Sequence, residues 1–339
     1  MWRWRGVVPV TAALLVGLAG CGGSGNPTED SELVIYSGRQ QALVEPLIDR
    51  FRQQTGIATS VRYGGTPELA AQLLEEGEAT PADVYFSQDG GALGALGRAG
   101  RLEPLPQSVL DTVPAQYRAE DGTWVGTSGR VRVIVYDPRQ VPEQEVPDSI
   151  FELTEPRWRG QVGIAPGNAS FAAFVTAIRV VRGDAAAKEW LEGMRANDVE
   201  RFDNNILILN AVKAGVVQLG LINHYYYYEQ VAEEGAAAMP ARLKFLPGGD
   251  PGALVNVAGV GILRGTDHAE QARRFVEFLL SEQSQAYFAQ ETKEYPLGAG
   301  VPAVADLPPL ESLQSPQIDL SDLDTLEQTQ QMIREAGLT

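Results

Sequence analysis

Four consecutive tyrosines occupy positions 225–228 of this 339-residue chain, and their phenol groups are the side chains best suited to chemistry. A phenolate is a hard, anionic oxygen donor, and it suits a hard trivalent cation such as Fe³⁺ much better than a soft metal. The pKa of a free tyrosine is about 10, so the bound cation has to supply the field that removes the proton. The alternatives are an aromatic segment packed in the core and a shelf for an organic ligand. Four adjacent hydroxyls are hard to satisfy in a core, so we favour a binding site.

The tyrosines follow an apolar segment at 216–222, which we expect to be a strand. Adjacent side chains of an extended segment point to opposite faces, so we expect His224 to point away from Tyr225 and to pack rather than to bind. A neighbouring pair of tyrosines can still converge on one ion where the strand ends and the backbone turns. Strand ends of this kind are also where α/β proteins carry their ligands.

Short apolar segments alternate with segments of helical periodicity along most of the chain. The expected strands cover residues 33–36, 61–63, 82–86, 132–136, 162–165, 216–222 and 253–263. The expected helices cover residues 43–51, 69–74, 93–96, 171–181, 185–194 and 275–287. This alternation predicts an α/β fold with helices on both faces of a parallel sheet. We expect two lobes with a ligand cleft between them.

The composition excludes several classes of protein. The chain has 44 Asp+Glu against 27 Lys+Arg, and a net charge of −17 repels nucleic acid and anionic lipid. Cys21 is the only cysteine, and His224 and His268 are the only histidines. An internal disulfide, a Cys-based zinc or iron–sulfur site and a three-histidine zinc site are therefore excluded. No nucleophile elbow, phosphate-binding Walker loop or dinucleotide fingerprint is present.

The N-terminus predicts export. A basic start and a mostly apolar run make residues 1–20 typical of a secretory signal peptide, and the run is too short to span a membrane comfortably. The sequence Leu-Ala-Gly-Cys at 18–21 resembles a bacterial lipobox, so we expect Cys21 to be acylated. Residues 21–31 are a flexible tether by composition. We expect a periplasmic or cell-surface protein whose only membrane contact is this lipid anchor.

Six short stretches of the mature chain carry a resemblance to a known family. They are Ile-Tyr-Ser-Gly-Arg at 35–39, Pro-Ala-Asp-Val at 81–84, Ser-Gly-Arg-Val-Arg at 128–132, Ile-Asn-His-Tyr-Tyr at 222–226, Asp-Pro-Gly-Ala-Leu at 250–254 and Glu-Tyr-Pro-Leu at 294–297. In this order and spacing, they make the chain similar to the periplasmic ferric-iron-binding proteins of ABC iron importers. The likeness covers nearly all of the mature chain.

The resemblance implies a type II-like periplasmic-binding-protein fold, in which two α/β lobes joined by crossover strands close on Fe³⁺. It implies lobes of residues 32–130 plus 256–305 and of residues 131–255 plus 306–339. It places the family's paired tyrosine ligands on Tyr225 and Tyr226. It also implies a monomer that is not an enzyme and that delivers ferric iron to an ABC permease and its ATPase.

The first lobe departs from the pattern of many family members. Gln40 and Gln88 stand where those members have a histidine and a glutamate, and a neutral amide is a poor ligand for Fe³⁺. Other members are rich in tyrosine and complete the coordination with carbonate or water, and this chain is closer to them. Tyr36 at the first strand end is a candidate ligand, and its alternative is a packed tyrosine.

Two tyrosinates leave a positive charge and open positions on Fe³⁺, and the resemblance implies that a synergistic anion, carbonate or phosphate, fills both needs. The family binds this anion at a helix N-terminus, which the turn at 168–170 matches. Arginines can neutralise it with two hydrogen bonds each, or can instead form salt bridges. The expected anion-binding residues are Asn168, Ala169, Ser170, Asn205, Asn223, Arg39, Arg130 and Arg132.

Two other functions stay open at this point. The first is a binder of a small organic or anionic solute, such as a polyamine or a phosphorylated compound, that stacks on the tyrosines. The second is a hydrolase with the same two lobes, although the sequence has no recognisable pair of nucleophile and base. A visible charge-transfer band distinguishes iron from an organic solute.

Overall fold

The structure is a computed structural model that describes residues 32–298, 300–304 and 306–339, so the expected signal peptide, tether and Cys21 lie outside the described residues. Its strands are β1 (Leu33–Ser37), β2 (Thr59–Tyr63), β3 (Val84–Ser87), β4 (Val125–Tyr136), β5 (Val162–Ile164), β6 (Glu200–Arg201), β7 (Leu219–Asn223), β8 (Arg242–Lys244), β9 (Val255–Ile262) and β10 (Tyr295–Pro296).

The α-helices fill the connections between the strands. They are α1 (Gln41–Thr55), α2 (Thr66–Glu76), α3 (Gly90–Arg98), α4 (Gln107–Leu110), α5 (Ala169–Arg182), α6 (Asp184–Ala196), α7 (Asn205–Lys213), α8 (His224–Glu234), α9 (Ala269–Leu280), α10 (Glu282–Gln290) and α11 (Leu326–Glu335). In the described residues, no helix is long and apolar enough to cross a membrane.

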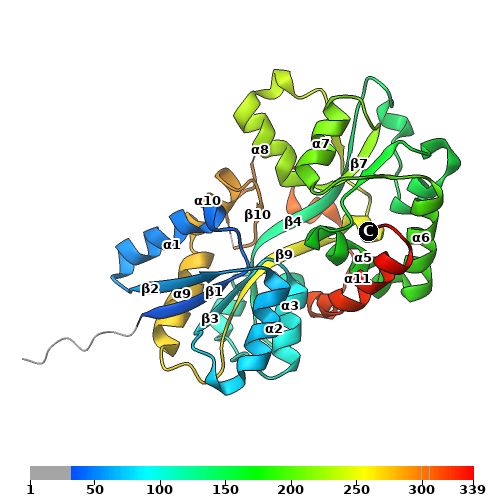
Figure 1. The fold of residues 1–339 in the computed structure, drawn as a ribbon. Helices are drawn as coiled ribbons and strands as arrows, with labels where there is room; N and C mark the ends of the chain where they lie inside the picture. Colours follow the sequence, from blue (N-terminus) through cyan, green and yellow to red (C-terminus); the bar gives the residue numbers. More distant parts are fainter. Residues whose placement is uncertain (1–31, 299, 305) are drawn as a thin grey trace, which may run out of the picture. The chain divides into compact units, whose positions relative to one another are not determined.

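The sheet is organised around β4, which belongs to both lobes (Figure 1). The strand order is β2-β1-β3-β9-β4-β7-β5-β6, and β8 and β10 also pair with β4. The first half of β4 pairs antiparallel with β9, and its second half pairs antiparallel with β7 and β8. All 12 residues of β4 are buried. A single strand therefore carries the backbone from the sheet of one lobe into the sheet of the other.

Most of the predicted elements are confirmed. Strands β1, β2 and β3 are parallel, as the alternation of strands and helices predicts, and β5 is parallel to β7. The expectation of a wholly parallel sheet is wrong, because β4 and β9 pair antiparallel with their neighbours and make the sheet mixed. The two-lobed α/β fold is confirmed as well. The single helix expected at 275–287 is wrong, because Ser281 has an extended backbone and ends α9. Its hydroxyl accepts a hydrogen bond from the Ser284 N–H and so begins α10 instead.

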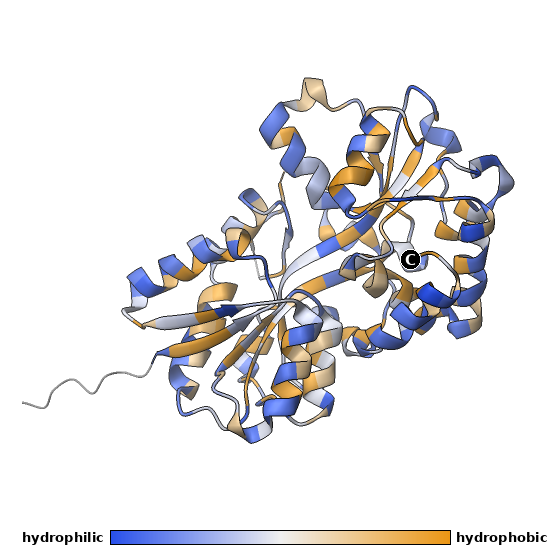
Figure 2. Ribbon diagram, in the orientation of Figure 1, coloured by the Kyte–Doolittle hydropathy of each residue, from blue (hydrophilic) through white to orange (hydrophobic). Residues whose placement is uncertain are grey.

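Two clusters of buried side chains form the core. One joins β1, β3 and β9 to helices α1, α3 and α9, and it includes Phe51, Phe86 and Phe275. The other lies under α5 and α6 and includes Phe171 and Trp190. In Figure 2, hydrophobic residues dominate the strands, and the outer helices are striped with hydrophilic ones. This is the pattern of a sheet that is covered on both faces.

The C-terminal segment contacts both lobes. The 3-10 turn η9 (Leu320–Asp324) packs on α3, where Arg98 forms ion pairs with Asp322 and Asp324. Helix α11 packs instead on α5. The segment after 306 therefore bridges the two lobes, and the expected division of the chain between the lobes stays a prediction.

The contact of α3 with η9 requires glycine at Gly94. A Cβ at this position would lie 2.4 Å from the backbone oxygen of Ser321, closer than real Cβ atoms come. We predict that Gly94→Ala lowers the free energy of unfolding by about 1–3 kcal/mol, the usual cost of overpacking. Gly97→Ala on the same helix is the control, because its nearest neighbour is the hydroxyl of Thr123 at 3.0 Å, a side chain that can move. Equal stability of the two variants in urea denaturation would contradict this packing.

Candidate functional site

A cavity of about 480 Å³ collects most of the expected binding residues. The loops that follow β1, β2 and β3 line it from the first lobe, and the starts of α5 and α8 line it from the second lobe. The cavity therefore lies where strands of both lobes end, the usual ligand position in α/β proteins. The expected residues that line it are Arg39, Arg130, Asn168, Ala169, Ser170, Asn223, Tyr225 and Tyr226.

The four tyrosines lie in the first turns of α8, and the expectation of an extended strand end is wrong for them. Strand β7 stops at Asn223, which has an extended backbone, and the helix begins with the next residue. Successive helical side chains diverge by about 100°, so two neighbours can share one wall. The rings of Tyr225 and Tyr226 are 4.2 Å apart and both line the cavity.

The remaining two tyrosines are not among the residues that line this cavity. The hydroxyl of Tyr228 donates a hydrogen bond to the backbone oxygen of Asp306 at 3.0 Å. The ring of Tyr227 packs edge-on against that of Tyr228 at 5.2 Å. The run of four thus divides into a cavity pair and a packing pair.

His224 packs beneath the tyrosine pair and is fully buried. Its Nδ1 accepts the N–H of Val131 at 3.2 Å, and its Nε2 lies 2.9 Å from the carbonyl oxygen of Lys293. This assigns the proton to Nε2, because a carbonyl can only accept. Burial lowers the pKa of His224 to about 4, so the ring is neutral at pH 7. Both ring nitrogens are thus engaged by the backbone.

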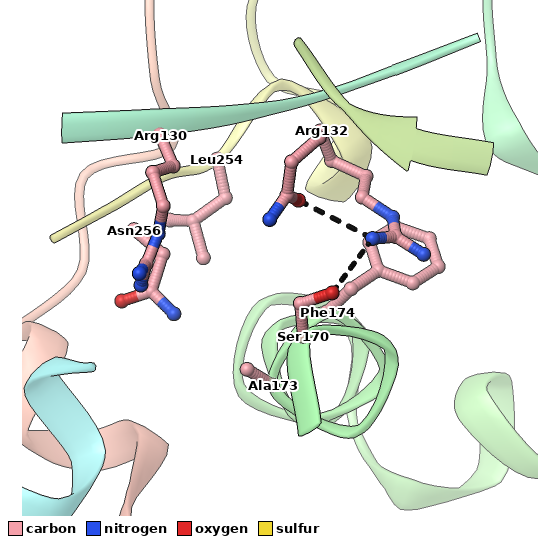
Figure 3. Close-up of a pocket in the computed structure, with 8 residues that line it drawn as sticks. Arg130, Arg132, Ser170, Ala173, Phe174, Leu254 and Asn256 are labelled. Carbon is pink, nitrogen blue, oxygen red and sulfur yellow. Dashed lines mark hydrogen bonds between the residues drawn. The ribbon is translucent and has the colours of Figure 1, made fainter. Parts of the chain in front are cut away.

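Arg130 and Arg132 point from the same face of β4, because they are two residues apart on one strand. They line a small cavity of about 30 Å³ that shares residues with the larger one (Figure 3). Both side chains are at most 5% exposed. Neither forms an ion pair with a described carboxylate, whereas buried arginines normally do.

In the described residues, the Arg132 guanidinium is bonded to neutral oxygens and lies over the rings of Phe171 and Phe174, whose centroids are 6.0 and 5.7 Å from its Cζ. Its Nη1 donates to Ser170 Oγ at 3.1 Å and to the side-chain oxygens of Asn205 and Asn223 at 3.2 Å each. Its Nε and Nη2 have no partner in the described residues. Burial lowers the pKa of Arg132 to about 10, so the group is still charged at neutral pH. A buried charge with free donors beside a cavity is suited to bind an anion.

The start of α5 adds hydrogen-bonding groups to the same wall. Asn168 caps this helix, and its Oδ1 accepts the Ser170 N–H at 2.9 Å and the Ser170 hydroxyl at 2.6 Å. Asn205 lines neither cavity and reaches the site only through its bonds to Arg132 and Ser170. The expected anion-binding turn therefore lies beside the unpaired arginine, with Asn205 behind it.

Arg39 has contacts that argue against its expected role at the anion. Its Nη1 and Nη2 donate to the two carboxylate oxygens of Glu294 at 2.9 and 2.6 Å, and both side chains are buried. Burial opposes the charge of Arg39, but Glu294 keeps the pKa above its ordinary value. This arginine is already neutralised, so it lines the cavity as one half of an ion pair.

The other expected residues of the first lobe divide into two groups. Tyr36 does not line the cavity, because its ring is buried and its hydroxyl lies 3.2 Å from Glu76 Oε1. Gln40 and Gln88 do line it, and Gln88 Oε1 accepts a hydrogen bond from Arg39 at 2.9 Å. In the described residues, no three His, Cys, Asp or Glu side chains form a metal-binding cluster.

The sequence analysis did not single out several residues that the structure adds to the cavity. The segment from the end of β2 through the loop to the first turn of α2 contributes all of residues 63–68, and Asn256 of β9 and Gln330 of α11 also line the wall. The Gly-Gly pair at 64–65, directly after an expected strand, was the available signal for the loop. Gln330 had no such signal, because a long-range contact places it there.

Comparisons with known proteins agree with this geometry. The family described as bacterial extracellular solute-binding protein matches residues 79–319. The Fe(3+)-binding periplasmic protein of Serratia marcescens is 33% identical over 310 residues, which is 91% of each chain. The major ferric iron-binding protein of Neisseria meningitidis serogroup B is 33% identical over 91% of this chain and 93% of its own.

Solved structures give the same result for the fold. Iron-bound HitA from Pseudomonas aeruginosa has a TM-score of 0.83 and 33% identity, over 90% of this chain and 99% of its own. A Trichodesmium protein in complex with iron and citrate has a TM-score of 0.79 and 28% identity, over 91% of this chain and 100% of its own.

The half-buried carboxyl of Glu229 on α8 yields a prediction about pH. Burial and then the nearby Glu294 and Glu233 raise the pKa of Glu229 to about 7. The folded state thus holds this proton more tightly than the unfolded state, whose pKa is about 4.3. Protonated Glu229 therefore contributes fully to stability below a pH of about 4.3, and this contribution is lost as the pH rises through 7. We predict that Glu229→Gln raises the melting temperature at pH 8 and changes it little at pH 4.

The control for this measurement is Glu189→Gln, because Glu189 is exposed on α6. It should shift the melting temperature equally little at both pH values. A Glu229→Gln variant with the same difference from the wild type at pH 4 and pH 8 would contradict the raised pKa.

Proposed function

Because the chain belongs to the family of bacterial extracellular solute-binding proteins, we propose that its solute is ferric iron, bound by Tyr225 and Tyr226. One observation carries this proposal: two adjacent phenols line a cavity with the buried Arg130, and Arg132 lines the small cavity that shares residues with it. Neither of these two arginines forms an ion pair with a described carboxylate. The names of the relatives support iron over an organic or other anionic solute. They also support a binding protein rather than a hydrolase.

The chemistry of the phenols favours a strongly charged cation. Burial raises the pKa of Tyr225 well above its ordinary value, and the neighbouring Tyr226 adds to this effect. The phenolate therefore forms only where a cation supplies a strong field, which Fe³⁺ does. Each phenol that binds the ion releases its proton, so the affinity falls as the pH falls.

A synergistic anion completes the site in this proposal. Fe³⁺ with two tyrosinates keeps one positive charge, and Arg130 and Arg132 add two more. An oxyanion such as carbonate or phosphate offsets these charges and fills open positions on the ion. Arg130, Arg132 and the start of α5 offer it N–H groups. The citrate in the Trichodesmium complex supports a site of this kind.

The setting of the protein follows from its N-terminus and its family. We propose that Cys21 carries a lipid, that residues 21–31 are the tether, and that the monomer works outside the cytoplasm. The lobes of residues 32–130 plus 256–305 and 131–255 plus 306–339 close on the ion. An ABC permease and its ATPase then take up the iron from the closed protein.

We predict that Tyr225→Phe and Tyr226→Phe each remove most of the iron affinity and weaken or shift the visible tyrosinate band. Phenylalanine keeps the ring and its packing, so only the oxygen donor is lost. If the hydroxyls were merely structural, their loss would cost stability of about 1 kcal/mol and leave iron binding intact. The measurement is the visible spectrum with metal analysis of the purified variants. Tyr228→Phe is the control, because its hydroxyl bonds the Asp306 carbonyl, and it should keep the band.

We predict that Arg132→Gln makes iron affinity nearly independent of added phosphate or carbonate. The amide of glutamine still donates to the neutral oxygens around it, but the charge that holds the anion is gone. Iron affinity is measured against anion concentration in the wild type, in Arg132→Gln and in the exposed-site control Arg62→Gln. An anion dependence that is unchanged in Arg132→Gln would remove this residue from the anion site.

A further inference from the structure

The proposed iron site has donors on one lobe only. Tyr225 and Tyr226 both lie on α8, and the arginines lie on β4. The first-lobe positions Gln40 and Gln88 line the cavity but carry neutral amides. A ferric ion with two tyrosinates still has open positions, and a donor from the first lobe at one of them would join that lobe to the ion. Such a donor has to come from a position other than Gln40 and Gln88.

Two acidic residues of the described chain line the cavity, both from the first lobe. One of them, Asp89, already has a structural role. Asp89 is buried and caps α3, where its Oδ1 accepts the Ala92 N–H at 2.9 Å. Moving this carboxylate to an ion would leave the start of α3 without its cap. Burial also raises the pKa of Asp89, so its surroundings disfavour the charged form.

Glu68 is the other acid, and nothing in the described residues holds its carboxylate by a hydrogen bond or an ion pair. It is exposed on the first turn of α2, and residues 63–68, from the end of β2 to this turn, all line the cavity. A Cβ built on Gly65 would lie 1.8 Å from Glu68 Oε2. The carboxylate therefore lies directly over the Gly65 backbone, and Gly65 itself lines the cavity.

We propose that the Glu68 carboxylate is the ligand that the first lobe contributes to the ferric ion, a proposal that rests on the proposed iron site at Tyr225 and Tyr226. A carboxylate is a hard oxygen donor, as Fe³⁺ requires. With Glu68 and two tyrosinates, the charge of the ion is neutralised. The two unpaired arginines then balance a doubly charged anion. Glycine at 65 leaves room for the carboxylate to lie against the wall that closes on the ion.

Tyr63 is the last residue of β2, at the start of the same 63–68 segment, and it serves as the internal comparison. It also lines the cavity, but its hydroxyl donates a hydrogen bond to Glu45 of α1. Burial raises the pKa of Tyr63, and the bond to Glu45 raises it further. The phenol of Tyr63 therefore stays neutral and bonded to Glu45, whereas the carboxylate of Glu68 has no such partner in the described residues. We assign Tyr63 to the wall and not to the ion.

The test uses the purified mature protein, loaded with ferric iron from its nitrilotriacetate complex. The variants are Glu68→Gln and Tyr63→Phe, and the readouts are the visible band and the affinity in competition with a chelator. We expect Glu68→Gln to lower the affinity by at least about 10-fold, the scale at which even outer partners of metal ligands act. Its tyrosinate band should persist but shift in wavelength. Tyr63→Phe should keep the wild-type band and affinity.

Other outcomes separate the ways in which this proposal can fail. Wild-type affinity and band in Glu68→Gln, with the band lost in Tyr225→Phe, would overturn the role of Glu68 and leave the iron site standing. A wild-type protein without a visible band would overturn the proposed function itself. A loss of affinity that disappears in about 1 M salt would mark long-range attraction rather than coordination, because the screening length is then about 3 Å. A band shift in Tyr63→Phe alone would assign the ligand to Tyr63 and overturn the proposal.

Discussion

A guanidinium group enters the interior at Arg132, and no carboxylate of residues 32–298, 300–304 or 306–339 forms an ion pair with it. Burying an unpaired ion typically costs several kcal/mol, so the surrounding dipoles have to offset much of this. Three oxygens do so, and they come from the start of α5, the start of α7 and the end of β7. One side chain of β4 thereby connects the starts of α5 and α7 with the end of β7. It also leaves two donor nitrogens free beside a cavity.

The tyrosine pair is connected to Arg132 through Asn223. Arg132 holds the side chain of Asn223, and α8 begins at the next residue. The phenols are therefore in the first turn of a helix that begins directly after a residue bonded to the arginine. Their phenolates favour the charged form of Arg132 in return, although burial is the larger effect on its pKa. The metal position and the anion position are thus electrostatically coupled.

The sequence predicted the components of this site better than their connections. Period-two and helical patterns located every expected strand and most helices, because burial of a sheet and of helix faces leaves a local signature. The tyrosine pair and the turn at 168–170 carried their own motif and lie in the cavity as expected. The helical start of α8 was missed, because four tyrosines have no helical periodicity of their own. The break at Ser281 was missed because one capping hydroxyl outweighs an amphipathic pattern.

Contacts between distant residues had no signal in the sequence. Arg39 and Glu294 are 255 positions apart, so neither residue type predicts the ion pair that neutralises Arg39 at the cavity wall. Tyr36 looked like a ligand because it ends a strand, but its hydroxyl turns toward Glu76 on α2 instead of the cavity. Both outcomes depend on which polar groups meet after folding. Local patterns therefore located the walls of the cavity, whereas the pairing of charges inside it was set by tertiary structure.

This pairing of charges leaves some charged groups at the cavity without an ion-pair partner in the described residues. Glu294 is neutralised by Arg39 and accepts further hydrogen bonds from Ser128 and Thr292. Asp89 caps the start of α3. The charges without a partner are then the cations of β4 on one side and the Glu68 carboxylate on the other. A ferric ion with an anion can satisfy both sides at once, because it presents positive charge to the carboxylate and negative charge to the arginines. A neutral organic solute would leave both sides unpaired, so the distribution of charge itself selects for a metal–anion pair.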